Sequence, residues 1–417
     1  MTLGTLFSYL VGSRRAIQEL AASRWSLAVG PVLVVSGGLA RSYDGAYLPA
    51  EWTVLLRGIT VSVCNSFILY SLVFVGVRMH RAPPAPFWRG YAGFLGLFWM
   101  TAPMAWLYAV PYERLLSPVE AINANLWTLA AVSVWRVVLI SRVLAVLFEV
   151  SGIAVFFVVM LFSDVAVFLA SVLMPQPIVD VMGGLHQTEV ERAIAGSVFA
   201  TQIWTVLSSP IWIIGALIAV SVFKRHKPVP AAEFSPAARP TRAVAALAAV
   251  SVVGWAPILA RTQAEQRLRH RAETMLRAGD VDGAFAEMSA HARHDYPPVW
   301  EPPPGGLYHE GGVSIAQVRE ALTRQRSAAW VESVYLDKSW REVLRASHVF
   351  WGDLPSDVLH DVERGVQCDL EGIRFHAEHD SRLSEEERRA LWRCVELLEV
   401  TVVPLTMGDG LRGTTGR

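Results

Sequence analysis

Two short clusters of histidine and carboxylate side chains could bind a metal ion. His291 and His294 stand three residues apart, and His376 and His379 repeat that spacing further along the chain. Side chains three apart on a helix point the same way, and imidazole together with carboxylate suits zinc. Neither cluster has the His-Glu-x-x-His spacing of hydrolytic zinc sites, and histidine near a helix end is stabilised by the helix dipole alone. Surface capping is therefore the favoured interpretation, with metal binding as the alternative.

Two cysteines could form a disulfide in the C-terminal part of the chain. Cys368 and Cys394 fall on two predicted helices that would pair as an antiparallel hairpin, which places them at the same level. However, Cys368 lies opposite the apolar stripe of its helix, whereas Cys394 borders the apolar face of its own. A disulfide and two free thiols are equally open alternatives, because bonding needs both Cβ vectors to point together.

Four ionisable residues lie within or beside long apolar stretches: Arg57, Arg136, Glu149 and Asp164. Both arginines are about five residues inside one end of a stretch, where long basic side chains extend to the membrane interface. Asp164 is near the middle of its stretch, and an ionised carboxylate there costs at least ~2.5 kcal/mol. We therefore expect Asp164 to face the bundle interior, with Arg57 as its preferred partner. The alternative shifts this span toward earlier residues, which encloses Glu149 and leaves Asp164 at the outer boundary.

The apolar stretches themselves predict membrane spans. Hydrophobic residues make up 53% of the 417 residues, above the share usual for soluble domains. A helix needs about 20 mainly apolar residues to cross ~30 Å of hydrocarbon. Six stretches approach this length: 52–77, 91–110, 121–140, 153–173, 203–223 and 243–259. A seventh, 25–40, is shorter and contains Gly30-Pro31 and Gly37-Gly38, which indicates a kinked or thinned span. The sequence thus predicts an all-α, polytopic bundle of about seven transmembrane helices.

Charge patterning predicts the orientation of this bundle. Residues 1–259 carry 17 basic and 11 acidic side chains, and residues 260–417 carry 20 and 26. Arginine and lysine gather in alternate short connections, which are retained on the cytoplasmic side. This pattern predicts a cytoplasmic N-terminus and, after an odd number of spans, a periplasmic C-terminal domain on a bacterial inner membrane. The acidic C-terminal part argues against nucleic acid as a partner.

Three domains follow from these patterns. Residues 1–24 form an N-terminal amphipathic segment, interpreted equally well as a helix lying on the inner leaflet or as a cytoplasmic extension of the first span. Residues 25–259 form the transmembrane domain. Residues 260–417 form a soluble, mainly helical domain with a Pro-rich strap at 296–306, for which packing over the helices is favoured over binding to an aromatic groove.

No nucleophile elbow, phosphate-binding loop, dinucleotide fingerprint or paired-cysteine site occurs in the sequence. We therefore expect no catalytic residue and no cofactor. The favoured function is a non-enzymatic membrane component that contacts the lipid bilayer and binds or scaffolds another envelope protein or a second copy of itself. A transporter or permease-like protein is the alternative, disfavoured by the few intramembrane charges and by the lack of an inverted repeat.

Two short motifs carry a resemblance to known proteins. The run from Phe94 to Pro103, continued by Tyr112-Glu113-Arg114, and the run Ser42-Tyr43-Asp44-Gly45 resemble a family of uncharacterised bacterial polytopic membrane proteins. The likeness covers mostly the membrane half of the chain. It implies a polytopic helical fold and no particular activity.

Overall fold

The computed structural model describes residues 2–80, 82–173, 189–222, 241–298, 300–303, 313, 315–324, 327–335, 338 and 392. The chain divides into two compact units. The first comprises residues 1–178 and 187–334, and all contacts discussed below lie within it. Nearly all of the second unit, and with it Cys368, Cys394, His376 and His379, falls outside the described residues.

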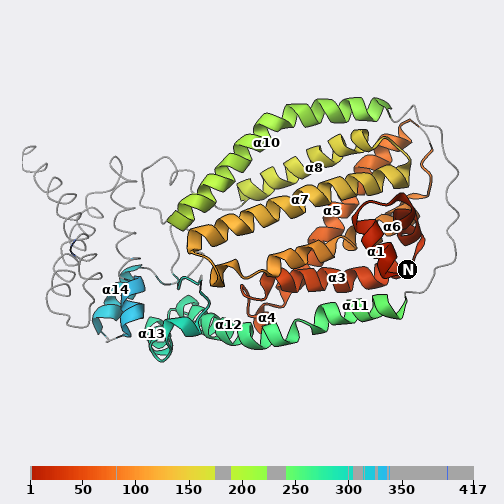
Figure 1. Ribbon diagram of the computed structural model, residues 1–417. Helices are drawn as coiled ribbons and strands as arrows, with labels where there is room; N and C mark the ends of the chain where they lie inside the picture. The colour runs from red at the N-terminus through yellow and green to blue at the C-terminus, as the bar shows by residue number, and fades with distance from the viewer. Residues whose placement is uncertain are drawn as a thin grey trace, which may run out of the picture. The chain divides into compact units, whose positions relative to one another are not determined.

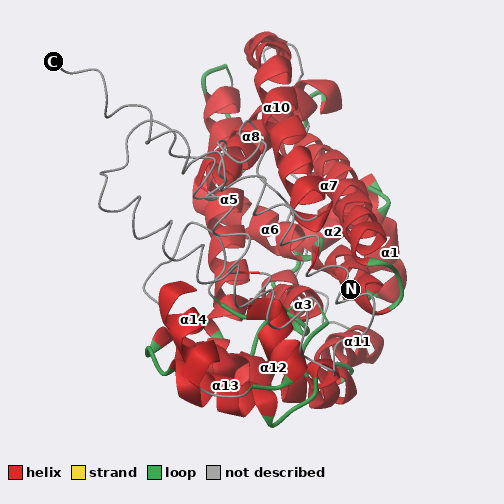
Figure 2. Ribbon diagram, turned by 90° about the vertical axis from the view of Figure 1, so that its left-hand side faces the viewer, coloured by secondary structure: helices red, strands yellow, loops and turns green. Residues whose placement is uncertain are grey.

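The described part of the chain is all-helical, without a strand (Figure 2). Six helical segments in it are long and apolar enough to cross a membrane, and the bent pair α2–α3 raises that number to seven. The helices that build the bundle are α3 (Trp25–Ser42), α5 (Thr53–Arg78), α6 (Phe87–Trp99) with the 3₁₀ helices η1 (Ala102–Ala109) and η2 (Tyr112–Arg114), α7 (Pro118–Phe148), α8 (Gly152–Leu173), α10 (Glu189–Val222) and α11 (Arg242–Val253). This architecture agrees with the predicted all-α membrane class.

Helix α3 is buried among its neighbours through small residues. A Cβ added at Gly30 would lie 2.8 Å from the Cβ of Trp99, and one added at Gly96 would lie 2.8 Å from the Cβ of Ser26. Close backbone approach of this kind is typical of helix packing in membranes. The glycines therefore serve as contact surfaces, and α3 runs as one helix of 18 residues with Pro31 inside it. Its length of ~27 Å nearly matches the hydrocarbon core.

Two short helices precede α3. Helices α1 (Leu3–Leu10) and α2 (Arg14–Ala22) are separated by a turn in which Gly12 has φ of 79°. The axis of α2 makes an angle of 102° with that of α3, so α2 lies across the direction of the spans. The Tyr9 side chain is fully buried, and its hydroxyl donates to the carbonyl oxygen of Leu97 at 2.6 Å. The N-terminal segment is thus part of the bundle.

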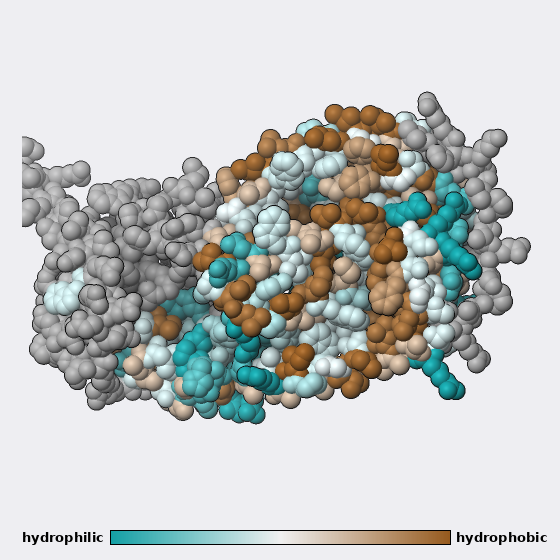
Figure 3. Space-filling view, in the orientation of Figure 1, coloured by the Kyte–Doolittle hydropathy of each residue, from teal (hydrophilic) through white to brown (hydrophobic). Residues whose placement is uncertain are grey.

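The outer faces of the bundle are apolar. Figure 3 shows hydrophobic residues across the side of the bundle and hydrophilic ones gathered toward its two ends. Large side chains such as Leu72, Trp204 and Leu217 are half or more exposed on α5 and α10. Monomeric soluble proteins rarely expose apolar surface on this scale. Contact with lipid accounts for it.

One long helical segment leads out of the bundle. Helix α11 is followed, after a two-residue turn, by α12 (Ala256–Arg277), and the two together span 36 residues or ~54 Å (Figure 1). This exceeds the ~30 Å of hydrocarbon, so much of α12 projects beyond it. Helix α13 (Val281–Ser289), η4 (Arg293–Asp295) and α14 (Ile315–Arg324) follow, and α12 packs against α13 as a hairpin.

The packing of α3 gives a first testable prediction. Gly30→Leu should lower the free energy of unfolding by about 1–3 kcal/mol, because the new side chain must displace Trp99 in a filled interior. Gly58→Leu is the matched control, since nothing lies within 4 Å of a Cβ at Gly58. Thermal unfolding of both variants in mild detergent, followed by circular dichroism, measures the difference. Equal melting of the two variants would contradict the close packing of α3.

Candidate functional site

The connection after α3 is held by a polar side chain of α12. Residues Tyr43 to Tyr47 precede the short helix α4 (Leu48–Glu51), and their backbone groups need partners outside a regular helix. Gln263 donates to the carbonyl oxygens of Tyr43 at 3.2 Å and Ala46 at 3.0 Å. Its own carbonyl oxygen accepts from the backbone N–H of Leu48 at 2.8 Å. One glutamine therefore ties both ends of this connection to α12.

Two further side chains of α12 reach the same connection. Gln266 and Arg269 follow Gln263 at intervals of three residues, which places all three on one face of the helix. The Gln266 amide donates to the carbonyl oxygen of Asp44. Arg269 donates from Nη1 to the carbonyl oxygen of Gly45 at 3.0 Å and from Nη2 to Glu51 Oε1 at 2.9 Å. The connection and α12 therefore form one unit.

An arginine of η2 joins the same helix. Arg114 donates to both carboxylate oxygens of Glu265, at 2.6 and 3.3 Å, in the two-pronged geometry that makes such pairs strong. The neighbouring Glu113 turns the other way and accepts from the Asn125 amide at 2.5 Å. Two adjacent residues of η2 therefore contact different helices: Glu113 contacts α7, and Arg114 contacts α12.

The described part of the Pro-rich segment packs against α12. Arg293 donates to the carbonyl oxygens of Pro297, Pro298 and Trp300 at 3.0, 3.1 and 2.8 Å. The Trp300 indole donates to Glu273 Oε1 at 3.0 Å. Proline cannot donate and cannot continue a helix here, so its carbonyls need such a donor. The arginine fixes the segment as an ordered turn beside α12.

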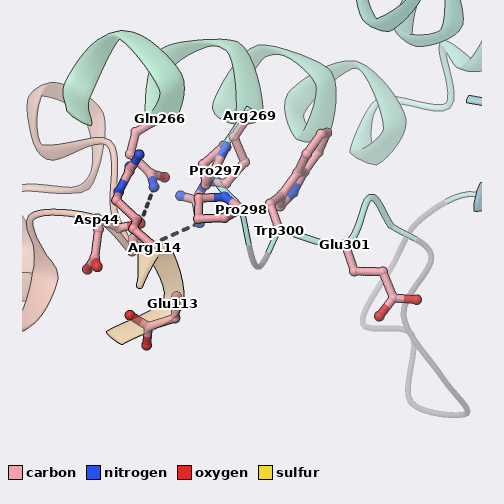
Figure 4. A pocket seen from close by; sticks show the side chains of 10 residues that line it. Asp44, Glu113, Arg114, Gln266, Arg269, Pro297, Pro298, Trp300 and Glu301 are labelled. Carbon is pink, nitrogen blue, oxygen red and sulfur yellow. Dashed lines mark hydrogen bonds between the residues drawn. The ribbon is translucent and has the colours of Figure 1, made fainter. Parts of the chain in front are cut away.

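A cavity of about 360 Å³ opens between these elements. Figure 4 shows Gln266 and Arg269 entering it from α12, opposite the η2 side chains. It is lined by Asp44, Gly45, Glu113, Arg114, Gln266, Arg269, Pro297, Pro298, Trp300 and Glu301. Its size is at the lower end of the range for small-molecule sites.

The charges around the cavity are unevenly balanced. Both arginines are engaged by carboxylates outside the lining, namely Glu265 and Glu51. Within the described residues, Asp44 and Glu113 form no ion pair. Burial and, second, the carboxylate of Glu113 raise the pKa of Asp44 above its ordinary value. The positive charge of Arg114 acts on Asp44 in the opposite direction, so burial has the largest effect on its pKa.

Asp164 belongs to α8, which is long and apolar enough to cross a membrane, and has a different partner from the predicted one. It is ~18 Å from the start of α8, close to the middle of that helix. Its Oδ2 accepts from the hydroxyl of Ser208, a buried residue of α10, at 2.7 Å. Arg57 is exposed near the start of α5 and forms no ion pair with Asp164 in the part of the chain described. Arg57 is therefore not the partner of Asp164, although α5 and α8 are in contact, because Asp164 faces Ser208 on α10, the main neighbour of α8.

Arg136 and Glu149 lie in and directly after α7. This helix begins at a Ser117–Glu120 capping box and continues to Phe148, past residue 140, the last residue of the predicted span. The guanidinium carbon of Arg136 is 4.6 Å from the centroid of the buried Phe98 ring, so the side chain packs against an aromatic face. Extension of this side chain to the membrane interface stays a prediction. Glu149 ends α7 with a left-handed backbone, φ 52°, at the turn to α8.

The described histidines do not form a metal site. Within the described residues, no group of three or more His, Cys, Asp or Glu side chains could hold a metal ion. His294 is 86% exposed beside Asp295, whereas the His291 ring lies against Tyr296. The metal hypothesis for this pair is therefore not supported.

The cavity residues were not recognised as a site from the sequence alone. A usable signal existed, because Asp44, Gly45, Glu113 and Arg114 belong to the two short motifs that end apolar stretches. Their meeting with α12 depends on contacts between residues more than 60 positions apart. No family model, no curated protein and no solved structure matches the chain.

Replacing Asp164 tests its placement inside the membrane. Asp164→Leu removes a carboxylate that costs at least ~2.5 kcal/mol and one hydrogen bond worth about 0.6 kcal/mol, so the variant should be the more stable protein. The expected rise in melting temperature in detergent is about 4–8 °C. Asp164→Asn, which can still accept from Ser208, should rise as well, and exposed Ser221→Ala is the control. Melting of both Asp164 variants at the parent's temperature would instead indicate an interfacial residue.

Proposed function

We propose that the chain is a non-enzymatic membrane component whose extracytoplasmic helical domain binds or scaffolds another envelope protein. The observation that carries this proposal is the rigid connection between the bundle and the α12–α13 hairpin. Helix α12 is continuous with the span before it and is tied to the connection after α3 and to η2 by Gln263, Arg269 and Glu265. A scaffold needs such a connection. When the binding hairpin is held at a fixed height and angle relative to the membrane, a partner binds it without the entropy cost of ordering a flexible linker.

The proposed orientation places α12 and α13 in the periplasm of a bacterium, with the N-terminus in the cytoplasm. The helix bounds support this orientation. Successive spans end on alternate sides of the membrane, and the helix ends on one of these sides carry Arg24, Arg78, Arg89 and Arg242. The opposite ends carry mainly acidic residues: Asp44, Glu51, Glu113 and Glu120. Arginine and lysine are retained on the cytoplasmic side.

A fusion measures this orientation. Alkaline phosphatase attached after Arg417 should be active, because the enzyme gains its disulfides only outside the cytoplasm. A fluorescent protein at the same position should stay dark. An inactive phosphatase together with a fluorescent reporter would remove one span from the count. Helix α3 would then be the helix that does not cross the membrane.

A transporter is the second candidate, and the Asp164–Ser208 pair is the observation that favours it. Polar side chains deep in a membrane often mark an ion pathway. On α10, Thr205 and Ser208 are buried at a spacing of three residues, so the pair belongs to a short polar stripe. The Thr205 hydroxyl donates to the carbonyl oxygen of Thr201 in its own helix at 2.8 Å, as hydroxyl side chains inside helices commonly do. The scaffold is therefore the better supported proposal.

Site-specific crosslinking tests the scaffold. A photo-crosslinking amino acid at exposed Arg267 of α12, or at Ala278 directly after it, should give a discrete adduct with one envelope protein in intact cells. Leu217 is the matched control, because it is 69% exposed on a membrane-spanning helix and should contact lipid only. The same adducts at all three positions, or none at α12, would contradict the scaffold.

A further inference from the structure

We propose that the N-terminal helices α1 and α2 form a binding surface for the headgroups of anionic phospholipids. This headgroup surface consists of the outward side chains of Phe7, Val11, Arg14 and Arg15, together with Arg142 of α7. The inference goes beyond the proposed scaffold, because it concerns the end of the bundle opposite to that from which α12 projects (Figure 1). It assigns a lipid class to a segment for which the sequence left two interpretations open.

The position of α2 is that of a helix at the membrane interface. Helix α3 begins at Trp25, shortly after α2 ends, and its length of ~27 Å nearly matches the hydrocarbon core. Because α2 makes an angle of 102° with α3, it runs across the span at its first turn. One face of α2, formed by Ala16, Ile17 and Leu20, is buried against the bundle. The exposed face of α2 therefore lies at the level of the lipid headgroups.

The exposed face of α2 is basic. Arg14 and Arg15 begin the helix, and Arg142 donates from Nε to the carbonyl oxygen of Gly12, in the turn before it, at 3.4 Å. All three arginines are exposed, and within the described residues none of them forms an ion pair. Glu19 is the single acidic residue of α2, so basic groups are in excess. Phosphate is the matching group, because a guanidinium donates two parallel N–H bonds to its oxygens.

Two large apolar side chains precede these arginines. Phe7 is 68% exposed and Val11 is 84% exposed, whereas Leu6 and Tyr9 of the same segment are buried. Helices at a membrane interface combine such apolar side chains, which enter the acyl boundary, with basic ones, which hold the headgroups. A lipid that is neutral overall would leave the excess positive charge unbalanced. The bilayer is adjacent to this surface already, which favours anionic lipid over a soluble protein as its occupant.

Native mass spectrometry of the purified full-length protein in nonionic detergent tests the charge requirement. The tightest phosphatidylglycerol site should bind that lipid more strongly than phosphatidylcholine with the same acyl chains. Arg14→Gln and Arg15→Gln should each weaken phosphatidylglycerol binding about fivefold, the contribution of one arginine near an anionic surface. Neither variant should change the melting temperature, because both side chains are exposed. Arg57→Gln is the matched control, since Arg57 is an exposed arginine of α5 outside the headgroup surface.

A nitroxide spin label at Val11→Cys tests the apolar side chains. The full-length chain, with its own cysteines replaced by serine, is reconstituted into vesicles of phosphatidylglycerol and phosphatidylcholine. The label should be relaxed by oxygen and protected from a water-soluble nickel complex, as at Leu217, which is 69% exposed on a membrane-spanning helix. A label at Asp282 of α13, which is 51% exposed, provides the reference for water.

Three outcomes would overturn the proposal. These are a label at Val11 that responds as the one at Asp282 does, equal affinity for the two lipids, and equal weakening in Arg57→Gln. The first of them would leave the surface facing water and open to a soluble partner. Crosslinking at α12 is measured separately, so the scaffold and the headgroup surface can fail independently.

Discussion

The hydroxyl group of Ser36 joins three segments of the chain in the interior of the bundle. It donates to the carbonyl oxygen of Ser251 at 2.6 Å and accepts from the indole N–H groups of Trp106 and Trp255 at 3.0 and 3.2 Å. Ser36 is fully buried, and no water is present in hydrocarbon to replace any of these bonds. One donor and two acceptor positions exhaust what a hydroxyl can offer. The positions of α3, η1 and the α11–α12 segment are therefore mutually dependent.

The cavity follows from that arrangement. Because Ser36 binds Ser251 and Trp255, α12 leaves the bundle beside the end of α3, and its polar face meets the connection that begins at Tyr43. Trp106 fixes η1 against the same helix, which brings η2 and Arg114 within reach of Glu265. The hydrogen bonds inside the membrane thus determine which charged groups meet outside it. Helix α12 leads directly from the bundle to the site. The position of the site is therefore set by the bundle, without a flexible linker between them.

Hydropathy predicts the spans well because length and apolar content are local properties of the sequence. It fails where neighbouring helices decide the outcome. Glycine and proline in 25–40 were interpreted as signs of a kinked or thinned span, and in the structure Gly30 and Gly37 lie against Trp99 and η1 within one helix of 18 residues. Helix α7 continues eight residues beyond 140, the last residue of the predicted span, because its apolar face packs against the bundle up to Phe148.

The site was less predictable than the fold, and the reason is physical. A carboxylate at the end of a span, such as Asp44 or Glu113, is ordinary in sequence because water normally surrounds it. Its meaning changes only when α12 and the Pro-rich segment cover it and place two such groups side by side. Burial first, and the Glu113 carboxylate second, raise the pKa of Asp44, whereas Arg114 acts on it in the opposite direction.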